Sequence, residues 1–139
     1  MKKGMLIHSD LSLLVATLGH MDQVTICDAG LPIPESVQRI DLALTHGMPA
    51  FIDTVQVMLA ECQIQAVTLA EEFQTVSPDH HRALLDALEH EQRATGKTID
   101  ISYVSHELFK QQTHQSRAVI RTGECTPYAN IIFHSGVVF

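Results

Sequence analysis

The chain has 139 residues, a length that suits one ordinary domain with a real hydrophobic core, so a single domain over residues 1–139 is expected. Hydrophobic residues make up 45% and charged residues 18%, which is typical of globular proteins and excludes the disordered class. The formal net charge is −7, and the nine lysines and arginines are scattered along the chain. Binding to nucleic acid or to an anionic membrane surface is therefore disfavoured.

The three cysteines, Cys27, Cys62 and Cys125, contain no C-x-x-C pair and suit neither a metal finger nor a disulfide framework. Cys27 precedes Asp28, whose carboxylate would disfavour a thiolate, so a cysteine nucleophile is not expected. No histidine pair has the i, i+4 spacing beside a carboxylate that indicates zinc, and no metal is expected.

The N-terminal segment is basic at Lys2 and Lys3, but the apolar stretch after it is interrupted at residues 8–10. That pattern is neither a signal peptide nor a membrane span. The sequence therefore predicts a cytoplasmic protein without a membrane partner.

Hydrophobic spacing predicts a first helix that ends at Gly19 or beside His20, with capping oxygens from Ser9 and Asp10. A short buried strand over 24–27 follows, then a Gly/Pro loop and a half-buried strand in which the apolar residues Ile40, Leu42 and Leu44 alternate with others.

Pro49 lies near the first turn of the next predicted helix, which carries Phe51, Val55 and Leu59 on one face. A strand over 63–70 comes next. The following helix is expected to begin with a Ser77 cap and to end at Gly96, with His80, His81 and His90 on its solvated face.

The remaining predicted elements are a strand over 98–104, a short helix over 106–113 and closing strands over 118–121 and 131–139. Because strands alternate with helices, the sequence predicts an α/β fold: one domain with a mixed or largely parallel sheet flanked by helices.

Five polar residues stand at the ends of these predicted elements: His20, Asp28, His106, Tyr128 and Asn130. In α/β sheets, ligands bind at loops beyond strand ends, so each is a candidate site residue. An imidazole gives and takes protons near neutral pH, and tyrosine and asparagine hydrogen-bond sugar hydroxyls.

Each candidate also has a structural interpretation. His20 would cap the last carbonyls of its helix, and Asp28 would form an Asx turn before Gly30. His106 would begin a helix, and Tyr128 would serve packing. The residue pattern alone leaves these alternatives open.

Four stretches resemble a known family: MKKGMLIHSDLSLLVATLGH, CDAGLPIP, RIDLAL and RTGECTPYANII. They are spread over the whole chain and are similar to signatures of the D-ribose pyranases, which are relatives of the L-fucose mutarotases. The similarity is closer to the ribose branch.

The resemblance implies that His20 is the acid/base residue and that Asp28, His106, Tyr128 and Asn130 bind the sugar. It implies ring-shaped homo-oligomers, decamers of two stacked pentamers, with each pocket at a subunit boundary. It also implies that no metal or organic cofactor is needed.

The implied activity is that of an isomerase in carbohydrate metabolism. It would interconvert the pyranose and furanose forms of D-ribose by opening and closing the hemiacetal, and so supply the furanose for ribose utilisation. Two alternatives are an L-fucose-type mutarotase and a non-catalytic sugar-binding accessory of ribose transport.

Overall fold

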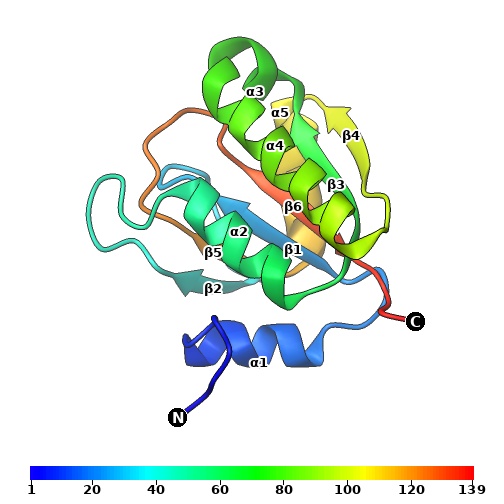
Figure 1. Ribbon diagram of the computed structural model, residues 1–139. Helices are drawn as coiled ribbons and strands as arrows, with labels where there is room; N and C mark the ends of the chain where they lie inside the picture. The colour runs from blue at the N-terminus through cyan, green and yellow to red at the C-terminus, as the bar shows by residue number, and fades with distance from the viewer.

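A six-stranded sheet in the order β2-β5-β1-β6-β3-β4 forms the centre of the structure, a computed structural model that describes residues 1–139 (Figure 1). The strand β6 runs antiparallel to both of its neighbours, β1 and β3, and every other neighbouring pair is parallel. The predicted mixed sheet is confirmed. Its strands are β1 (Gln23–Cys27), β2 (Gln38–Asp41), β3 (Ile64–Ala70), β4 (Asp100–Val104), β5 (Ser116–Arg121) and β6 (Ile131–Ser135).

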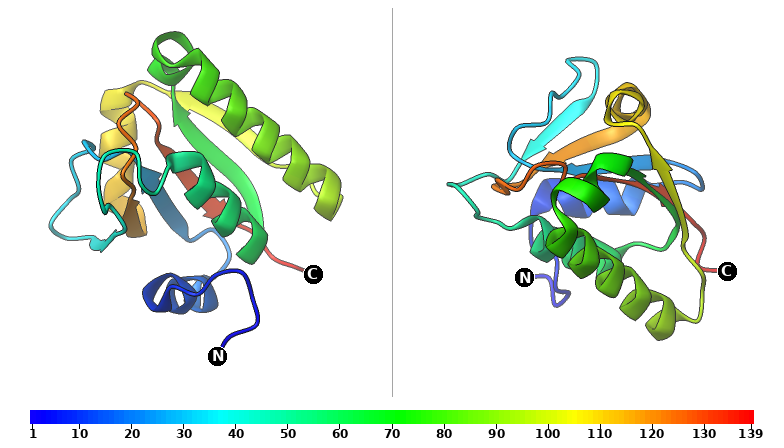
Figure 2. Two further views of the ribbon diagram at one scale, coloured as in Figure 1. Left: turned by 60° about the vertical axis from the view of Figure 1, so that its left-hand side comes forward. Right: turned by 90° about the horizontal axis from the view of Figure 1, so that it is seen from above.

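Helices cover the two faces of the sheet unequally (Figure 2). One face carries α1 (Ser9–Thr17), α2 (Phe51–Glu61), α3 (Glu71–Val76) and α4 (Pro78–Thr95). The other carries α5 (His106–Gln112), the gold helix in Figure 2, which leads into the short 3-10 helix η1 (Thr113–Gln115). None of the helices combines the length and apolar character that a membrane crossing requires.

The alternation of side chains along β1 divides the apolar interior into two cores. Val24 and Ile26 belong to the larger core, which lies beneath α1, α2 and α4. Cys27 belongs to the smaller core, where Phe109 of α5 is fully buried. Both faces of β1 are thus covered, as its run of apolar and β-branched residues predicted.

The first helix begins and ends one or two residues earlier than predicted. Its N-cap is His8, whose Nδ1 accepts a hydrogen bond from the Leu11 N–H at 3.4 Å, so the prediction of Ser9 and Asp10 as caps is wrong. It ends at Thr17, and His20 lies in the turn between α1 and β1.

The predicted strand around Ile40 is shorter than expected. It ends at Asp41, whose Oδ1 accepts from the Ala43 N–H at 3.0 Å, and Leu44 is 77% exposed. The Asp41 side chain turns the backbone out of the sheet, which the apolar alternation could not indicate.

Ser77 is the N-cap residue of α4 and Pro78 begins the helix, as predicted, but the prediction of a capping hydroxyl is wrong. The Ser77 hydroxyl caps no amide of α4 and donates instead to the Pro127 carbonyl at 2.8 Å. This bond ties the start of α4 to the loop before β6. The predicted end of the helix at Gly96 is confirmed, with φ at +70°.

The short helix α3 was not predicted, and it places Phe73 deep in the larger core. The Phe73 ring is fully buried, with its centroid 6.1 Å from that of Phe51 and 5.5 Å from that of His81. His81 Nε2 lies 2.8 Å from the Tyr103 hydroxyl, and burial lowers the pKa of His81. The placement of His81 on a solvated face is therefore wrong.

Replacing Phe73 by alanine tests how much this buried ring contributes to stability. We expect Phe73→Ala to lower the free energy of unfolding by about 3–5 kcal/mol, because a fully buried ring is removed and a cavity remains. Gln74→Ala, a change at the exposed neighbour on the same helix, is the control and should shift it by less than about 0.5 kcal/mol. Equal urea midpoints for the two variants would contradict this role.

Candidate functional site

Four of the five candidate residues lie at one edge of the sheet. Strands β1 to β5 all run in the same direction, so their carboxyl ends share this edge, and β6 begins there. Asp28 follows β1, His106 opens α5 just after β4, and Tyr128 and Asn130 immediately precede β6. The predicted address beyond strand ends is thus correct for these four.

Asp28 and Asn130 form one pair within this group. Asn130 is fully buried; its Oδ1 accepts from the Asp28 N–H at 2.8 Å and its Nδ2 donates to Asp28 Oδ2 at 3.0 Å. The other carboxylate oxygen of Asp28 accepts from the Gly30 N–H at 2.9 Å. The Asx turn considered for Asp28 is therefore present, and these bonds fix the direction of its carboxylate.

His106 and Tyr128 form a second pair. Their ring centroids lie 4.9 Å apart at 87°, and the imidazole also stacks with the Phe109 ring, with centroids 6.3 Å apart. Tyr128 has φ at +63°, a conformation that costs a bulky residue about 1–3 kcal/mol. The Asn130 N–H donates to the Tyr128 carbonyl at 2.8 Å and so joins the two pairs.

The backbone N–H of His106 is hydrogen-bonded, whereas the ring nitrogen Nδ1 has no hydrogen-bond partner. Its N–H donates to Glu72 Oε2 at 2.9 Å, and Ser105 caps α5 by accepting from the Leu108 N–H. The predicted helix start is thus confirmed. The Nδ1 atom of His106 is buried without a hydrogen-bond partner, and such atoms are rare in folded proteins.

Glu124 anchors the loop that carries Tyr128 and Asn130. Its Oε2 accepts from the Phe51 N–H at 3.2 Å, and its Oε1 accepts from the N–H groups of Cys125 and Thr126, each at 3.1 Å. Burial by itself raises the pKa of the Glu124 carboxyl, but the hydrogen bonds from Thr126 and Phe51 and the nearby His80 bring it below its ordinary value.

Gly123 lets this loop approach the chain before α2. A Cβ at position 123 would lie 2.4 Å from the carbonyl oxygen of Met48 and 2.5 Å from that of Thr45. Only glycine is tolerated in this close contact. Neither Glu124 nor Gly123 was predicted to shape the site, although an acid beside a glycine in an irregular loop could have indicated that role.

A hollow of about 480 Å³ adjoins the loop and is lined by Asp28, His46, Arg121, Glu124 and Thr126, among others. The Arg121 guanidinium in it is already occupied: it pairs with Asp41 at 3.1 Å and donates to the Ala29 carbonyl at 3.1 Å. The hollow therefore offers no free guanidinium, and the carboxylates of Asp28 and Glu124 in its lining would repel an anion, so it suits a neutral polyol better.

The thiol closest in sequence to this edge is unreactive. Burial and, to a smaller extent, the adjacent Asp28 carboxylate raise the pKa of Cys27 to about 12. The Cys27 thiol therefore stays protonated at neutral pH and is a poor nucleophile.

His20 lies apart from the other four candidates. It is exposed in the turn before β1, whereas Asp28 follows the opposite end of that strand. The length of β1 alone places roughly 13 Å between these ends at about 3.3 Å per residue. The only hydrogen bond of the His20 ring joins Nε2 to Oε1 of Gln65 on β3, at 2.8 Å. Within one chain the five residues do not form one site.

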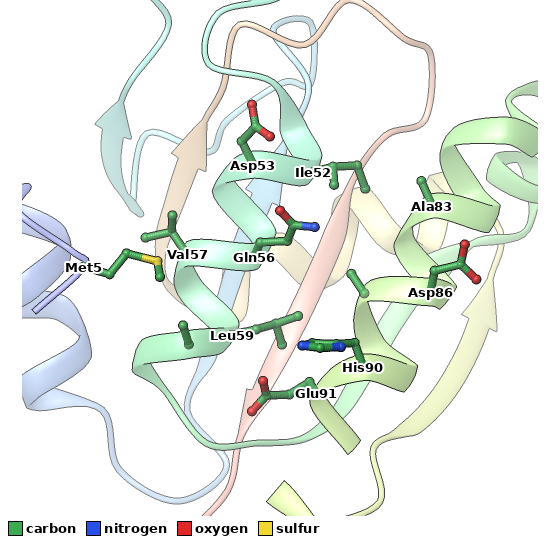
Figure 3. A pocket seen from close by; sticks show the side chains of 12 residues that line it. Met5, Ile52, Asp53, Gln56, Val57, Leu59, Ala83, Asp86, His90 and Glu91 are labelled. Carbon is green, nitrogen blue, oxygen red and sulfur yellow. The ribbon is translucent and has the colours of Figure 1, made fainter. Parts of the chain in front are cut away.

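The largest hollow, about 730 Å³, involves none of the five. It lies between α2 and α4, with an apolar floor that includes Val57 and Leu59 and a rim that includes Asp53, Asp86 and Glu91 (Figure 3). It lies on the helical layer rather than at a strand end, and Asp28, His106, Tyr128 and Asn130 are all absent from its lining.

Replacing Glu124 by glutamine tests the anchoring of the loop. We expect Glu124→Gln to destabilise the protein by about 1–3 kcal/mol at pH 7, because the amide cannot accept all three N–H groups. The folded pKa lies below the ordinary value of 4.5, so the carboxylate stabilises the fold above about pH 4.5 and loses this effect as the pH falls through the folded pKa.

The stability difference between wild type and Glu124→Gln should therefore shrink as the pH is lowered below about 4.5, as measured by urea unfolding at a series of pH values. Glu35→Gln, a change at an exposed acid, is the control. A difference that stays constant down to pH 3 would contradict the role of the charge.

Comparisons with known proteins agree with this architecture. The D-ribose pyranase of Vibrio parahaemolyticus is 68% identical over 139 residues, which cover 100% of both chains. The structure of Bacillus subtilis RbsD complexed with D-ribose is 42% identical, with a TM-score of 0.89 over 100% of both chains.

A fucose mutarotase from Streptococcus pneumoniae, solved with L-fucose, has a TM-score of 0.71 at 23% identity over 96% of this chain and 95% of that one, and shares the fold. The family model described as the RbsD / FucU transport protein family matches residues 1–138. With nearly the whole chain matched, this protein belongs to the RbsD / FucU transport protein family.

Proposed function

We propose that this protein is an isomerase that interconverts the pyranose and furanose ring forms of D-ribose, acting in the cytoplasm to supply the furanose for ribose utilisation. The observation that carries the proposal is the full-length 68% identity to a D-ribose pyranase. The relative solved with D-ribose supports the same sugar, and at 42% identity it is far more similar than the fucose mutarotase at 23%.

The chemistry needs only proton transfers. Opening a cyclic hemiacetal requires a proton on the ring oxygen and removal of one from the anomeric hydroxyl. Closing through O4 instead of O5 requires the reverse at a different oxygen. No carbon–hydrogen bond breaks, so general acid and base groups with hydroxyl-binding partners are sufficient.

In this proposal His20 carries the proton, since an imidazole populates both protonation states near neutral pH. Asp28 accepts hydrogen bonds from sugar hydroxyls, and the Asn130 amide accepts or donates them. The hydrogen bonds between Asp28 and Asn130 fix both groups before the sugar binds. Tyr128 offers a ring face and a hydroxyl, and the His106 imidazole offers a further polar contact.

The size of the required effect is moderate. Ribose rings open unaided in water, and general acid–base catalysis contributes typically about 10²–10⁴-fold, roughly 3–5 kcal/mol of barrier. One imidazole and a fixed set of hydroxyl partners suit that requirement.

The separation of His20 from the other four residues supports a site completed by a second copy. In such a contact, the edge of the sheet that carries His20 in one chain meets the edge that carries Asp28 in the next chain. A contact between two different surfaces is heterologous, and repeated heterologous contacts form a ring when the rotation between neighbouring copies closes. We therefore propose ring-shaped homo-oligomers, assembled as a decamer of two stacked pentamers, with each pocket at a subunit boundary.

Exchange NMR on ribose tests the activity. Wild-type protein should accelerate pyranose–furanose exchange, and His20→Ala should remove most of this acceleration, by about 10²–10⁴-fold, because the proton carrier is gone. His114→Ala, at an exposed histidine in η1, serves as the control.

The same assay separates the alternatives. Ribose binding without faster exchange would refute the isomerase and favour a sugar-binding accessory. Faster mutarotation of L-fucose than exchange of ribose would favour a fucose-type enzyme. Unchanged exchange in a folded His20→Ala variant would refute the role of His20.

Mixed assemblies test the shared pocket. His20→Ala removes one side of the proposed site, and His106→Ala removes the other while keeping the backbone N–H that binds Glu72. Each pure variant should be inactive, whereas rings assembled from an equal mixture should recover activity at about one quarter of their sites.

A pocket contained within one chain predicts no recovery. Confirmation by native mass spectrometry that the rings are mixed makes that negative result decisive.

A further inference from the structure

We propose that Gln65 is a positioning residue that holds the His20 ring by Nε2 and leaves Nδ1 as the nitrogen that exchanges protons with the sugar. This inference rests on the proposed role of His20 in ring exchange. It assigns a task to a residue outside the five candidates and names the reacting atom of the imidazole.

The first support is the arrangement of hydrogen bonds around the Gln65 amide. Its Oε1 lies 2.8 Å from His20 Nε2, and its Nε2 donates to the Met21 sulfur at 2.8 Å. A thioether has no proton to give, so the amide nitrogen faces the sulfur and the amide oxygen faces His20. An oxygen at this place accepts a bond only from a protonated Nε2.

The second support is the position of Gln65 in the sheet. The register between β3 and β6 shifts between Ile64 and Ala66, so Gln65 lies at the irregularity. Such bulges redirect a side chain out of the regular alternation. The Gly136 backbone also lies close to the stem of Gln65, since a Cβ added at Gly136 would lie 3.1 Å from the Gln65 Cβ.

The third support is the turn that carries His20, which is fixed on both sides by its own hydrogen bonds. The Gly19 N–H donates to Asp22 Oδ2 at 2.8 Å, and the Met21 N–H donates to the Ser135 carbonyl at 2.8 Å. The backbone of the turn is therefore anchored to β6, and only the side-chain torsions of the exposed His20 remain free to rotate. Gln65 removes that freedom.

The chemical consequence follows from the two nitrogens of imidazole. With Nε2–H bound to Gln65 in both protonation states, only Nδ1 changes between acceptor and donor. The neutral ring takes the proton of the anomeric hydroxyl at Nδ1, and the charged ring returns a proton from Nδ1 to a ring oxygen. A ring held in this orientation avoids the loss of rate that misplacement causes.

Solid-state NMR of sedimented protein with ¹³C,¹⁵N-labelled histidine tests the contact directly, and His20→Ala identifies the signals by subtraction. In sugar-free wild type we expect the neutral His20 ring to carry its proton on Nε2 with Nδ1 unprotonated. Gln65→Met, of similar size but with only a weak thioether acceptor in place of the amide oxygen, should shift His20 towards a mixture of tautomers. Gln65→Glu, which keeps an oxygen there, should retain the Nε2–H form.

Kinetics then separate positioning from structure. Gln65→Met should lower kcat for ribose ring exchange roughly tenfold with KM little changed, because the orientation acts in the reaction step. Gln65→Glu should restore most of kcat, and Gln74→Met, at an exposed glutamine on α3, should behave as wild type.

A neutral wild-type His20 ring with its proton on Nδ1, an unchanged His20 spectrum in Gln65→Met, or a changed spectrum without a fall in kcat would each overturn the inference. The spectra are recorded without sugar and remain valid whatever the activity. A wild type that fails to accelerate ring exchange would refute the proposed function instead.

Discussion

The length of β1 is the constraint on which this account depends. A strand of five residues separates the turn with His20 from the turn with Asp28, and no side chain spans that distance. An imidazole and a set of hydroxyl-binding groups on opposite edges of one sheet cannot act on one small sugar within a single chain. The proposed function therefore calls for a contact between copies of the chain, in which these two edges of the sheet meet.

The edge with Asp28 is organised before any ligand arrives. The buried side chain of Asn130 binds Asp28 through two hydrogen bonds, and Glu124 collects three backbone N–H groups from the loop and from the start of α2. Groups fixed in this way lose little further freedom when they bind a substrate. The left-handed backbone of Tyr128 is the strained point of this arrangement.

Much of the fold was predictable, because local patterns determine it. The apolar face of Phe51, Val55 and Leu59 predicted α2, and Gly96 predicted the end of α4; both are confirmed. The side-chain caps at the starts of α1 and α4 were not predictable from local sequence, because His8 binds the Leu11 amide and Ser77 bonds to a carbonyl fifty residues away. The helix α3 was missed because its single core side chain, Phe73, gives no period.

The sequence predicted where single site residues lie along the elements, but not which of them come into contact. Strand ends indicated Asp28 and His106, and the family resemblance joined them to His20, Tyr128 and Asn130. The pairing of Asp28 with Asn130 spans 102 positions in the sequence, and the approach of Gln65 to His20 spans 45, so neither leaves a local signal. Such contacts arise from the order of strands in the sheet, which spacing along the chain does not encode.

A structure of the assembled protein with ribose bound measures the central claim most directly. The account predicts that each sugar contacts His20 of one copy and the Asp28, Tyr128 and Asn130 group of another. A sugar enclosed by the residues of a single chain, with His20 distant from every sugar, would contradict it.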